Sequence, residues 1–136
     1  MAGELLLDTG AFVALADRSE RCHSECVAAF ESWNGIIATT DAVLTETLHL
    51  VGPWRAQKSC LDFILRGAFV LVPSSHGSLA RASVLMARYR NVPMDYADAT
   101  LVALGEELGT DMVFTLDRKG FSTYRLDRRR SFAIIP

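Results

Sequence analysis

The chain has 136 residues, of which 50% are hydrophobic and 22% are charged, and its formal net charge is −2. This length and composition predict one domain, residues 1–136, with a sizeable core and no room for a second. No apolar run reaches the roughly 18 to 20 residues of a membrane span, and the N-terminus lacks the basic and long apolar regions of a secretory signal. We therefore expect a cytoplasmic protein without membrane contact.

The basic residues are unevenly divided between the two types. Of the 14 basic residues, Lys58 and Lys119 are lysines and the other 12 are arginines. The planar guanidinium group forms bidentate contacts with phosphate, although an arginine-rich surface can equally be ordinary solvated surface. The small net negative charge therefore does not exclude nucleic acid as a partner.

Short apolar segments alternate with longer helical patterns along the whole chain. Strands are predicted at residues 4–8, 35–39, 69–73 and 112–116, with a weaker one at 132–135. Helices are predicted at about 9–16, 21–33, 41–51, 54–66, 76–90 and 95–108. This alternation predicts an α/β fold, a three-layer α/β/α sandwich around a mainly parallel central sheet.

Cysteine usage favours core packing over metal binding. Cys22, Cys26 and Cys60 make an odd number without an export signal, so structural disulfides are not expected. His23 would point away from Cys22 and Cys26 on a helix, which argues against zinc. Cys22 and Cys26 instead recur on one helical face with Phe30 and Trp33, as core residues do.

Two aspartates directly follow predicted strands. Asp8 ends the apolar run 4–7, and Asp117 ends the run 112–116. Ligands of parallel α/β sheets gather beyond the carboxyl ends of the strands, where both aspartates would emerge if the two strands are close. The alternative is that each aspartate only begins a turn or caps the next helix.

Glu46 and Asp98 belong to predicted helices. Glu46 borders an apolar stripe, with the alternative that it is a solvated boundary residue; the stripe comprises Val43, Leu44, Leu48, Leu50 and Val51. Asp98 shares its helical side with apolar residues, where an unpaired charge is costly, and Asp95 lies three residues earlier. Asp95 is well explained as a helix cap, which leaves Asp98 in need of a compensating group. Carboxylates held close together repel one another, so such a cluster predicts a hard divalent cation.

These motifs in this order resemble the PIN-domain ribonucleases. The resemblance rests on Leu-Leu-Asp8-Thr-Gly, Leu-Thr-Glu46-Thr-Leu, Asp95-Tyr-Ala-Asp98-Ala-Thr-Leu-Val-Ala-Leu and Phe-Thr115-Leu-Asp117, followed by Phe121. It spans the whole chain. In length and motif spacing the chain is similar to the small stand-alone PIN proteins that act as toxins of VapBC-type toxin–antitoxin pairs.

The resemblance implies an endoribonuclease that depends on Mg²⁺ or Mn²⁺. It assigns the metal-binding and catalytic acids to Asp8, Glu46, Asp98 and Asp117, with Asp95 as a possible further ligand. Thr9 and Thr115 would lie beside these carboxylates. Carboxylate oxygens suit a hard cation, which activates water for attack on the phosphate, and the family leaves 5′-phosphate and 3′-hydroxyl ends.

The partners implied are RNA, a cognate antitoxin whose tail covers the acidic pocket, and a second copy of the chain in a homodimer. Candidate RNA contacts, which could line one cleft, are Arg18 and Arg21 after the first helix, Arg88 and Arg90 before Pro93, and Arg128, Arg129 and Arg130. A solvated edge explains the triple arginine equally well.

Other functions remain open. One is a PIN nuclease that processes RNA outside a toxin–antitoxin pair. Another is a catalytically silent α/β binding module. A phosphoaspartate receiver module also fits the size, but Asp41 does not follow the central strand that such a module needs.

Overall fold

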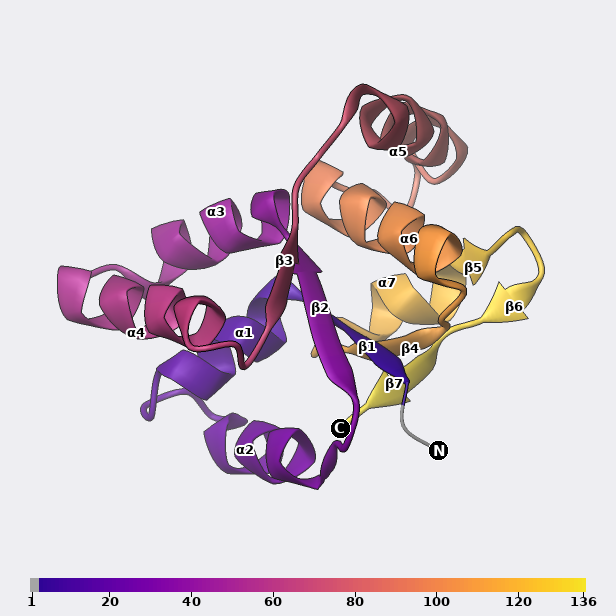
Figure 1. The fold of residues 1–136 in the computed structure, drawn as a ribbon. Coiled ribbons are helices and arrows are strands. Elements are labelled where there is room, and N and C mark those ends of the chain that lie inside the picture. The colour runs from indigo at the N-terminus through magenta and orange to yellow at the C-terminus, as the bar shows by residue number, and fades with distance from the viewer. Residues whose placement is uncertain (1–2) are drawn as a thin grey trace.

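The computed structural model describes residues 3–136. The elements alternate along the chain (Figure 1), in the order β1 (Glu4–Leu7), α1 (Thr9–Ala16), α2 (His23–Ser32), β2 (Ile36–Thr40), α3 (Asp41–Val51), α4 (Trp54–Leu65), β3 (Val70–Val72), α5 (His76–Arg88), α6 (Tyr96–Leu108), β4 (Met112–Phe114), α7 (Arg118–Thr123), β5 (Arg125–Leu126), β6 (Arg130–Ser131) and β7 (Ala133–Ile135).

The central sheet has five strands in the order β3-β2-β1-β4-β7, and every pairing in it is parallel. The chain fills the sheet outward from β1 through β2 to β3, then crosses back to place β4 on the other side of β1. Leu6 pairs with Val113 and Leu7 with Phe114. The direction of strand addition therefore reverses between β1 and β4, which is the point where open α/β sheets form a crevice at their carboxyl ends.

Helices cover both faces of the sheet, which confirms the predicted three-layer α/β/α architecture. Figure 1 shows α1 to α4 on one side and α5 and α6 on the other. The first layer is held by a cluster of rings from α1, α2, α4 and the start of β3, with centroids 5.1–6.4 Å apart, comprising Phe12, Phe30, Phe63 and Phe69. A second cluster lies around α7, with centroids 5.1–5.5 Å apart, comprising Tyr89, Phe121, Tyr124 and Phe132.

The predicted elements lie within two residues of the observed ones, but three elements were missed. The helix α7 has only six residues, and β5 and β6 have two residues each, so none carries a readable periodicity. Asp127 and Arg128 form the turn between β5 and β6, with φ values of 50° and 67°. Positive φ at both turn residues matches the twist of a tight hairpin.

The structure corrects one predicted helix face, that of α3, and confirms another, that of α2. Leu50 is 59% exposed, so its assignment to the buried stripe of α3 was wrong, and Thr47 is buried there in its place. Thr47 tolerates burial because its hydroxyl donates to the Val43 carbonyl oxygen at 2.8 Å. The expected packing of the cysteine face of α2 is confirmed: Cys26 is fully buried, and its neighbours on that face pack against the core.

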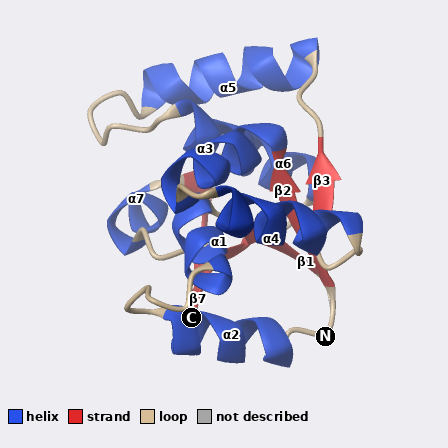
Figure 2. Ribbon diagram, turned by 90° about the vertical axis from the view of Figure 1, so that its left-hand side faces the viewer, coloured by secondary structure: helices blue, strands red, loops and turns tan. Residues whose placement is uncertain are grey.

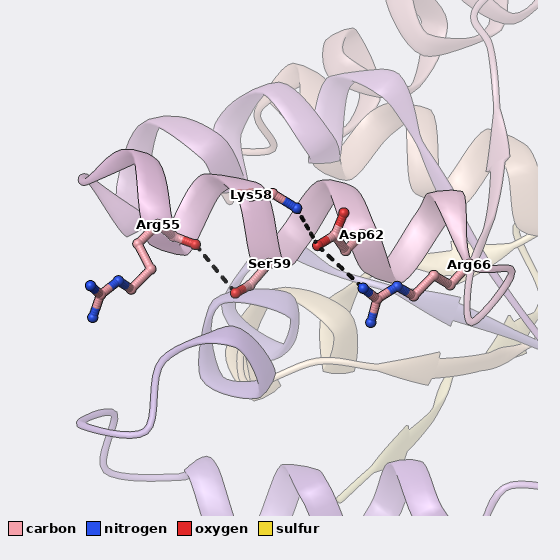
Figure 3. Close-up of polar contacts among 5 residues, drawn as sticks. All are labelled: Arg55, Lys58, Ser59, Asp62 and Arg66. Carbon is pink, nitrogen blue, oxygen red and sulfur yellow. Dashed lines mark hydrogen bonds and ion pairs between the residues drawn. The ribbon is translucent and has the colours of Figure 1, made fainter.

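The outer face of α4 carries charged side chains at helical spacing (Figure 3). Asp62 accepts a hydrogen bond from Lys58 at 3.0 Å and lies 3.9 Å from Arg66, while the Ser59 hydroxyl donates to the Arg55 carbonyl oxygen. Exposed pairs of this kind stabilise a helix by only about 0.3–0.5 kcal/mol each. This part of the basic surface is therefore accounted for as a solvated helix face. Among the described residues, no helix is long and apolar enough to cross a membrane.

Candidate functional site

The carboxyl ends of β1 and β4 bring together two of the predicted acids. Asp8 follows β1 directly, and its backbone N–H donates to the Phe114 carbonyl oxygen at 3.0 Å, which continues the pairing of the two strands. Asp117 follows β4 by three residues, at the same edge of the sheet. Both acids therefore lie at the crevice where the strand order reverses.

Thr115 joins these two acids. Its hydroxyl donates to Asp8 Oδ2 at 2.6 Å and accepts the backbone N–H of Asp117 at 2.9 Å. This buried hydroxyl thus acts as both donor and acceptor, which fixes its orientation. It therefore holds one oxygen of Asp8 in place. Thr115 thus contacts both residues, while its role beside a bound metal or water stays a prediction.

Asp117 also serves as the N-cap of α7, because its Oδ1 accepts the backbone N–H of Gly120 at 3.0 Å. The capping alternative and the cluster are thus not exclusive. Residue 120 must be glycine for this arrangement: a Cβ there would lie 2.3 Å from Asp117 Oδ2 and 3.1 Å from the Tyr124 hydroxyl oxygen. Any larger residue would displace the Asp117 carboxylate from the rim.

The first turn of α6 supplies two further acids with different surroundings. Asp95 is exposed and caps the helix, with its Oδ1 accepting the Asp98 N–H at 2.8 Å. Asp98 is half-buried, and its Oδ2 accepts the Tyr124 hydroxyl at 3.2 Å and the Asp95 N–H at 3.4 Å. The sequence-based distinction between a capping Asp95 and a more enclosed Asp98 is therefore confirmed.

Glu46 lies across from this turn, on α3. Ala42, Thr45, Glu46 and His49 form one stripe of that helix, which lines a shallow hollow of about 610 Å³ together with residues 95–97. Glu46 therefore shares this hollow with Asp95. His49 lines the same hollow, because it lies three residues after Glu46 and so on nearly the same helix face.

Burial and mutual repulsion disturb the pKa values of two acids. Burial raises the pKa of Asp8 to about 6, opposed by hydrogen bonds from Thr115 and Thr9 and reinforced by the charges of Asp117 and Asp95. Burial likewise raises the pKa of Asp98 to about 8, reinforced by the charges of Asp8 and Asp95. The four aspartates therefore act on one another as a cluster of uncompensated negative charge.

This cluster fits a divalent cation in its chemistry. Asp8, Asp98 and Asp117 each have one carboxylate oxygen in a side-chain or backbone hydrogen bond, which orients the group, and hard cations take carboxylate oxygens. Beside Asp8, the buried Thr9 hydroxyl has no hydrogen-bond partner within the described chain. Three acids do not yet converge closely enough to enclose an ion in residues 3–136. Binding would have to draw the carboxylates together.

The stability of the metal-free protein should fall as the pH rises from 5 to 8. Asp8 and Asp98 hold their protons up to about pH 6 and 8 in the folded chain, but release them near pH 3.8 when unfolded. Between these values the folded state binds more protons, so each pH unit favours unfolding by up to about 1.4 kcal/mol per group. Melting temperatures in EDTA at pH 5, 6.5 and 8 measure this.

The lowered pKa values of Asp17, Asp41 and Glu106 make the stability rise with pH instead. They do so only below about pH 4.5, outside the range from pH 5 to pH 8. Asp98→Asn is the control, since it removes the group with the higher pKa and should flatten the dependence. A wild-type melting temperature that increases from pH 5 to pH 8 in EDTA would refute the charge crowding described above.

Two of the predicted RNA-binding arginines do not lie at this rim. Arg18 and Arg21 come after α1, which begins at the rim beside Asp8 and leads away from it. They precede α2, which lies beside the amino ends of the strands; the arrowheads of β2 and β3 point away from α2 in both ribbon views (Figures 1 and 2).

The arginines of the β5–β6 hairpin are similarly distant. Arg130 lies 3.9 Å from the Asp111 carboxylate, next to the amino end of β4, whereas Asp117 follows its carboxyl end. The hairpin arginines therefore lie toward the opposite end of β4 from Asp117. Whether they bind RNA elsewhere stays a prediction.

Sequence reasoning missed several residues at the rim. Arg118 and Lys119 follow Asp117 in α7, and they are the basic residues that adjoin an acid of the cluster in sequence. Tyr124 contacts Asp98 from 26 residues away, and no motif identified it. Gly120 was the one readable signal, since a glycine three residues after a capping aspartate often marks a tight turn.

Comparison with known proteins assigns the chain to a family. A sequence model of the PIN domain matches residues 5–126, which includes all of the acids described above. The chain belongs to the PIN-domain family. This PIN protein is 26% identical to Ribonuclease VapC26 of Mycobacterium tuberculosis over 135 residues, which cover 97% of this chain and 100% of that one.

Solved structures share the fold. One is Mycobacterium tuberculosis VapC20, described as a sarcin–ricin loop cleaving toxin, with a TM-score of 0.75 and 20% identity over 80% of this chain and 86% of that one. Another is a toxin–antitoxin complex from Klebsiella pneumoniae, with a TM-score of 0.64 and 19% identity over 88% and 91% of the two chains. The PIN fold predicted from the sequence motifs is thereby confirmed.

Proposed function

We propose that this PIN protein is an endoribonuclease that hydrolyses RNA phosphodiester bonds and acts as the toxin of a type II toxin–antitoxin pair. The observation that carries this proposal is that Asp8 at the β1–β4 crevice of a PIN fold lies near enough to Asp117 and Asp98 for their charges to act on one another. The similarity to Ribonuclease VapC26 over 97% of this chain supports the ribonuclease activity. The likeness in fold to VapC20, described as a toxin, supports the toxin role.

We assign the cofactor as Mg²⁺ or Mn²⁺. Asp8, Asp98 and Asp117 would hold it, with Glu46 and Asp95 near by, because each of the three has an oxygen free of protein hydrogen bonds from other side chains. Such an ion, when bound, lowers the pKa of a coordinated water and stabilises negative charge on phosphate. Thr115 keeps Asp8 oriented by donating to its Oδ2, and α7 keeps Asp117 at the rim through the Gly120 N–H.

In residues 3–136 no histidine hydrogen-bonds Asp8, Asp98 or Asp117, and His49 lines the hollow beside Glu46 on α3. A carboxylate-rich site instead suits attack by water. The products would then carry 5′-phosphate and 3′-hydroxyl ends, since the 2′-hydroxyl takes no part in the reaction.

The partners we propose are RNA and a cognate antitoxin protein in the cytoplasm, with the toxin as a homodimer. A structural neighbour is described as a toxin–antitoxin complex, which supports an antitoxin partner. An exposed rim with several unneutralised carboxylates also favours a partner with a basic segment, because opposite charges would relieve the repulsion between the acids. A coding sequence for a small DNA-binding protein next to this one would support the toxin role over RNA processing.

Cleavage of RNA by the purified protein tests the activity. We expect single-stranded or loop RNA to be cut with Mg²⁺ or Mn²⁺ and left intact with EDTA, and excess Mn²⁺ to restore the cut. Products should accept ligation at their 5′ ends without prior phosphorylation. Cutting that persists in EDTA, or products that end in cyclic phosphates, would contradict the proposal.

A further inference from the structure

A buried and closely packed ring holds the Tyr124 hydroxyl against Asp98. The side chain is 1% exposed, and its ring packs edge-on against Phe121 and Tyr89, with centroids 5.1 and 5.2 Å away. The hydroxyl donates to Asp98 Oδ2 at 3.2 Å. Because the ring is enclosed on both sides, the hydroxyl cannot follow Asp98 if that carboxylate turns away.

The hydrogen bonds around the three buried or capping acids share a pattern. Asp8 uses Oδ2 for Thr115, Asp98 uses Oδ2 for Tyr124 and for the Asp95 N–H, and Asp117 uses Oδ1. One oxygen of Asp98, Oδ1, is thus left free of these contacts. Outer hydrogen bonds of this kind orient metal-binding carboxylates and tune their affinity.

Tyr124 also lies near Asp117, the N-cap of α7. The Cβ that Gly120 lacks would touch both the Tyr124 hydroxyl and Asp117 Oδ2, at 3.1 and 2.3 Å, so the two atoms flank the same backbone position. The chain between them is α7, which Asp117 caps and Tyr124 ends. The helix therefore ties the Asp98 carboxylate to the loop that carries Asp117.

We propose that Tyr124 is a positioning residue for divalent cation binding: by holding Asp98 Oδ2, its hydroxyl presents Asp98 Oδ1 toward Asp8 and Asp117. This inference rests on the proposed function only in assuming that a divalent cation binds at these acids. Its role parallels that of Thr115 on Asp8, but it comes from a different element and from outside every motif in the sequence.

The test compares Tyr124→Phe with Tyr89→Phe. Both substitutions remove one hydroxyl from the same aromatic cluster and keep the ring, but the Tyr89 hydroxyl accepts the Arg125 N–H and touches no acid. We expect Tyr124→Phe to weaken Mn²⁺ binding, measured by calorimetry without RNA, by about tenfold or more, in the range known for such outer partners. Tyr89→Phe should stay within about twofold of the wild type.

Melting temperatures in EDTA separate positioning from packing. Tyr124→Phe should melt near the wild-type temperature in EDTA, while its gain from a fixed Mn²⁺ concentration should shrink. Wild-type Mn²⁺ affinity in Tyr124→Phe would overturn the proposal, as would an equal loss of affinity in Tyr89→Phe.

A measurement on the unaltered protein covers the case in which Tyr124→Phe does not fold. The chain has three tyrosines, so carbon NMR of protein labelled at the tyrosine Cζ gives three signals. Titration with Mg²⁺ should move the Tyr124 signal, because a cation on Asp98 withdraws charge from the oxygen that accepts the hydroxyl. The Tyr89 signal should stay in place. A Tyr124 signal that does not move while Mg²⁺ raises the melting temperature would overturn the proposal.

These readouts do not depend on RNA. If the protein binds Mn²⁺ in a manner that needs the Tyr124 hydroxyl but cuts no RNA, the proposed function fails and the role of Tyr124 stands. If RNA is cut with Mn²⁺ and Tyr124→Phe binds the ion as tightly as the wild type, the role of Tyr124 fails and the function stands.

Discussion

Replacement of Asp98 by asparagine is expected to lower the rate of RNA cleavage by at least about 100-fold, whereas the same change at Asp95 should leave most of the rate. Asparagine at position 98 can still accept the Tyr124 hydroxyl, so the fold should persist, but the charge that binds a cation is lost. A cation contributes several kcal/mol to charge stabilisation in such reactions, and about 1.4 kcal/mol is a factor of ten in rate.

Asp95 is expected to tolerate the change because its side chain is already committed to the cap. Its Oδ1 accepts the Asp98 N–H at 2.8 Å, and asparagine caps helices about as well as aspartate. Initial rates at saturating Mn²⁺, with circular dichroism as the fold control, measure both variants. An inactive Asp95→Asn beside a near-normal Asp98→Asn would reverse the assignment of the metal-binding acid in α6.

Mn²⁺ is expected to raise the melting temperature of the wild-type protein, and Asp8→Asn should lose most of that gain. An ion present at about 100 times its dissociation constant adds roughly 2.7 kcal/mol of stability, which is on the order of 5–10 °C for a chain of this length. Asp8 is 5% exposed and close to other carboxylates, so removing its charge takes away both repulsion and a cation ligand.

Without metal, Asp8→Asn should melt at or above the wild-type temperature at pH 7.5. At that pH Asp8 is mostly ionised, since its pKa is about 6, and an amide oxygen still accepts the Thr115 hydroxyl. Four melts decide the matter: each protein with EDTA and with Mn²⁺. If Asp8→Asn keeps the full shift with Mn²⁺, Asp8 does not bind the ion.

The sequence was informative where local pattern and sheet geometry coincide. Asp8 and Asp117 were identifiable because each follows an apolar strand, and parallel strands open at one edge. The adjacency of β1 and β4 was not readable, because strand order depends on how the helices pack across more than 100 residues. Asp98 and Asp95 were separable by helical position, since Asp95 caps α6 and is exposed, whereas Asp98 lies three residues further on and is half-buried.

Contacts that form only when distant elements pack could not be predicted from the sequence. Tyr124 approaches Asp98 through α7, a six-residue helix with no periodic signal. The position of the arginines was unreadable for a related reason. Composition indicates phosphate-binding chemistry but not where it lies, and the hairpin that holds Arg130 folds against the opposite end of β4 from Asp117. Charge counts therefore indicated a class of partner without locating its surface.

Cleavage in water enriched in ¹⁸O tests most directly whether the acid cluster at the β1–β4 crevice hydrolyses RNA with water. Under single-turnover conditions with Mn²⁺, the account predicts one ¹⁸O atom in the 5′-phosphate of the downstream product, detected by mass spectrometry, and none at the 3′ end of the upstream product. An unlabelled 5′-hydroxyl on the downstream product, with a cyclic phosphate upstream, would show that the RNA 2′-hydroxyl is the attacking group and would contradict the account.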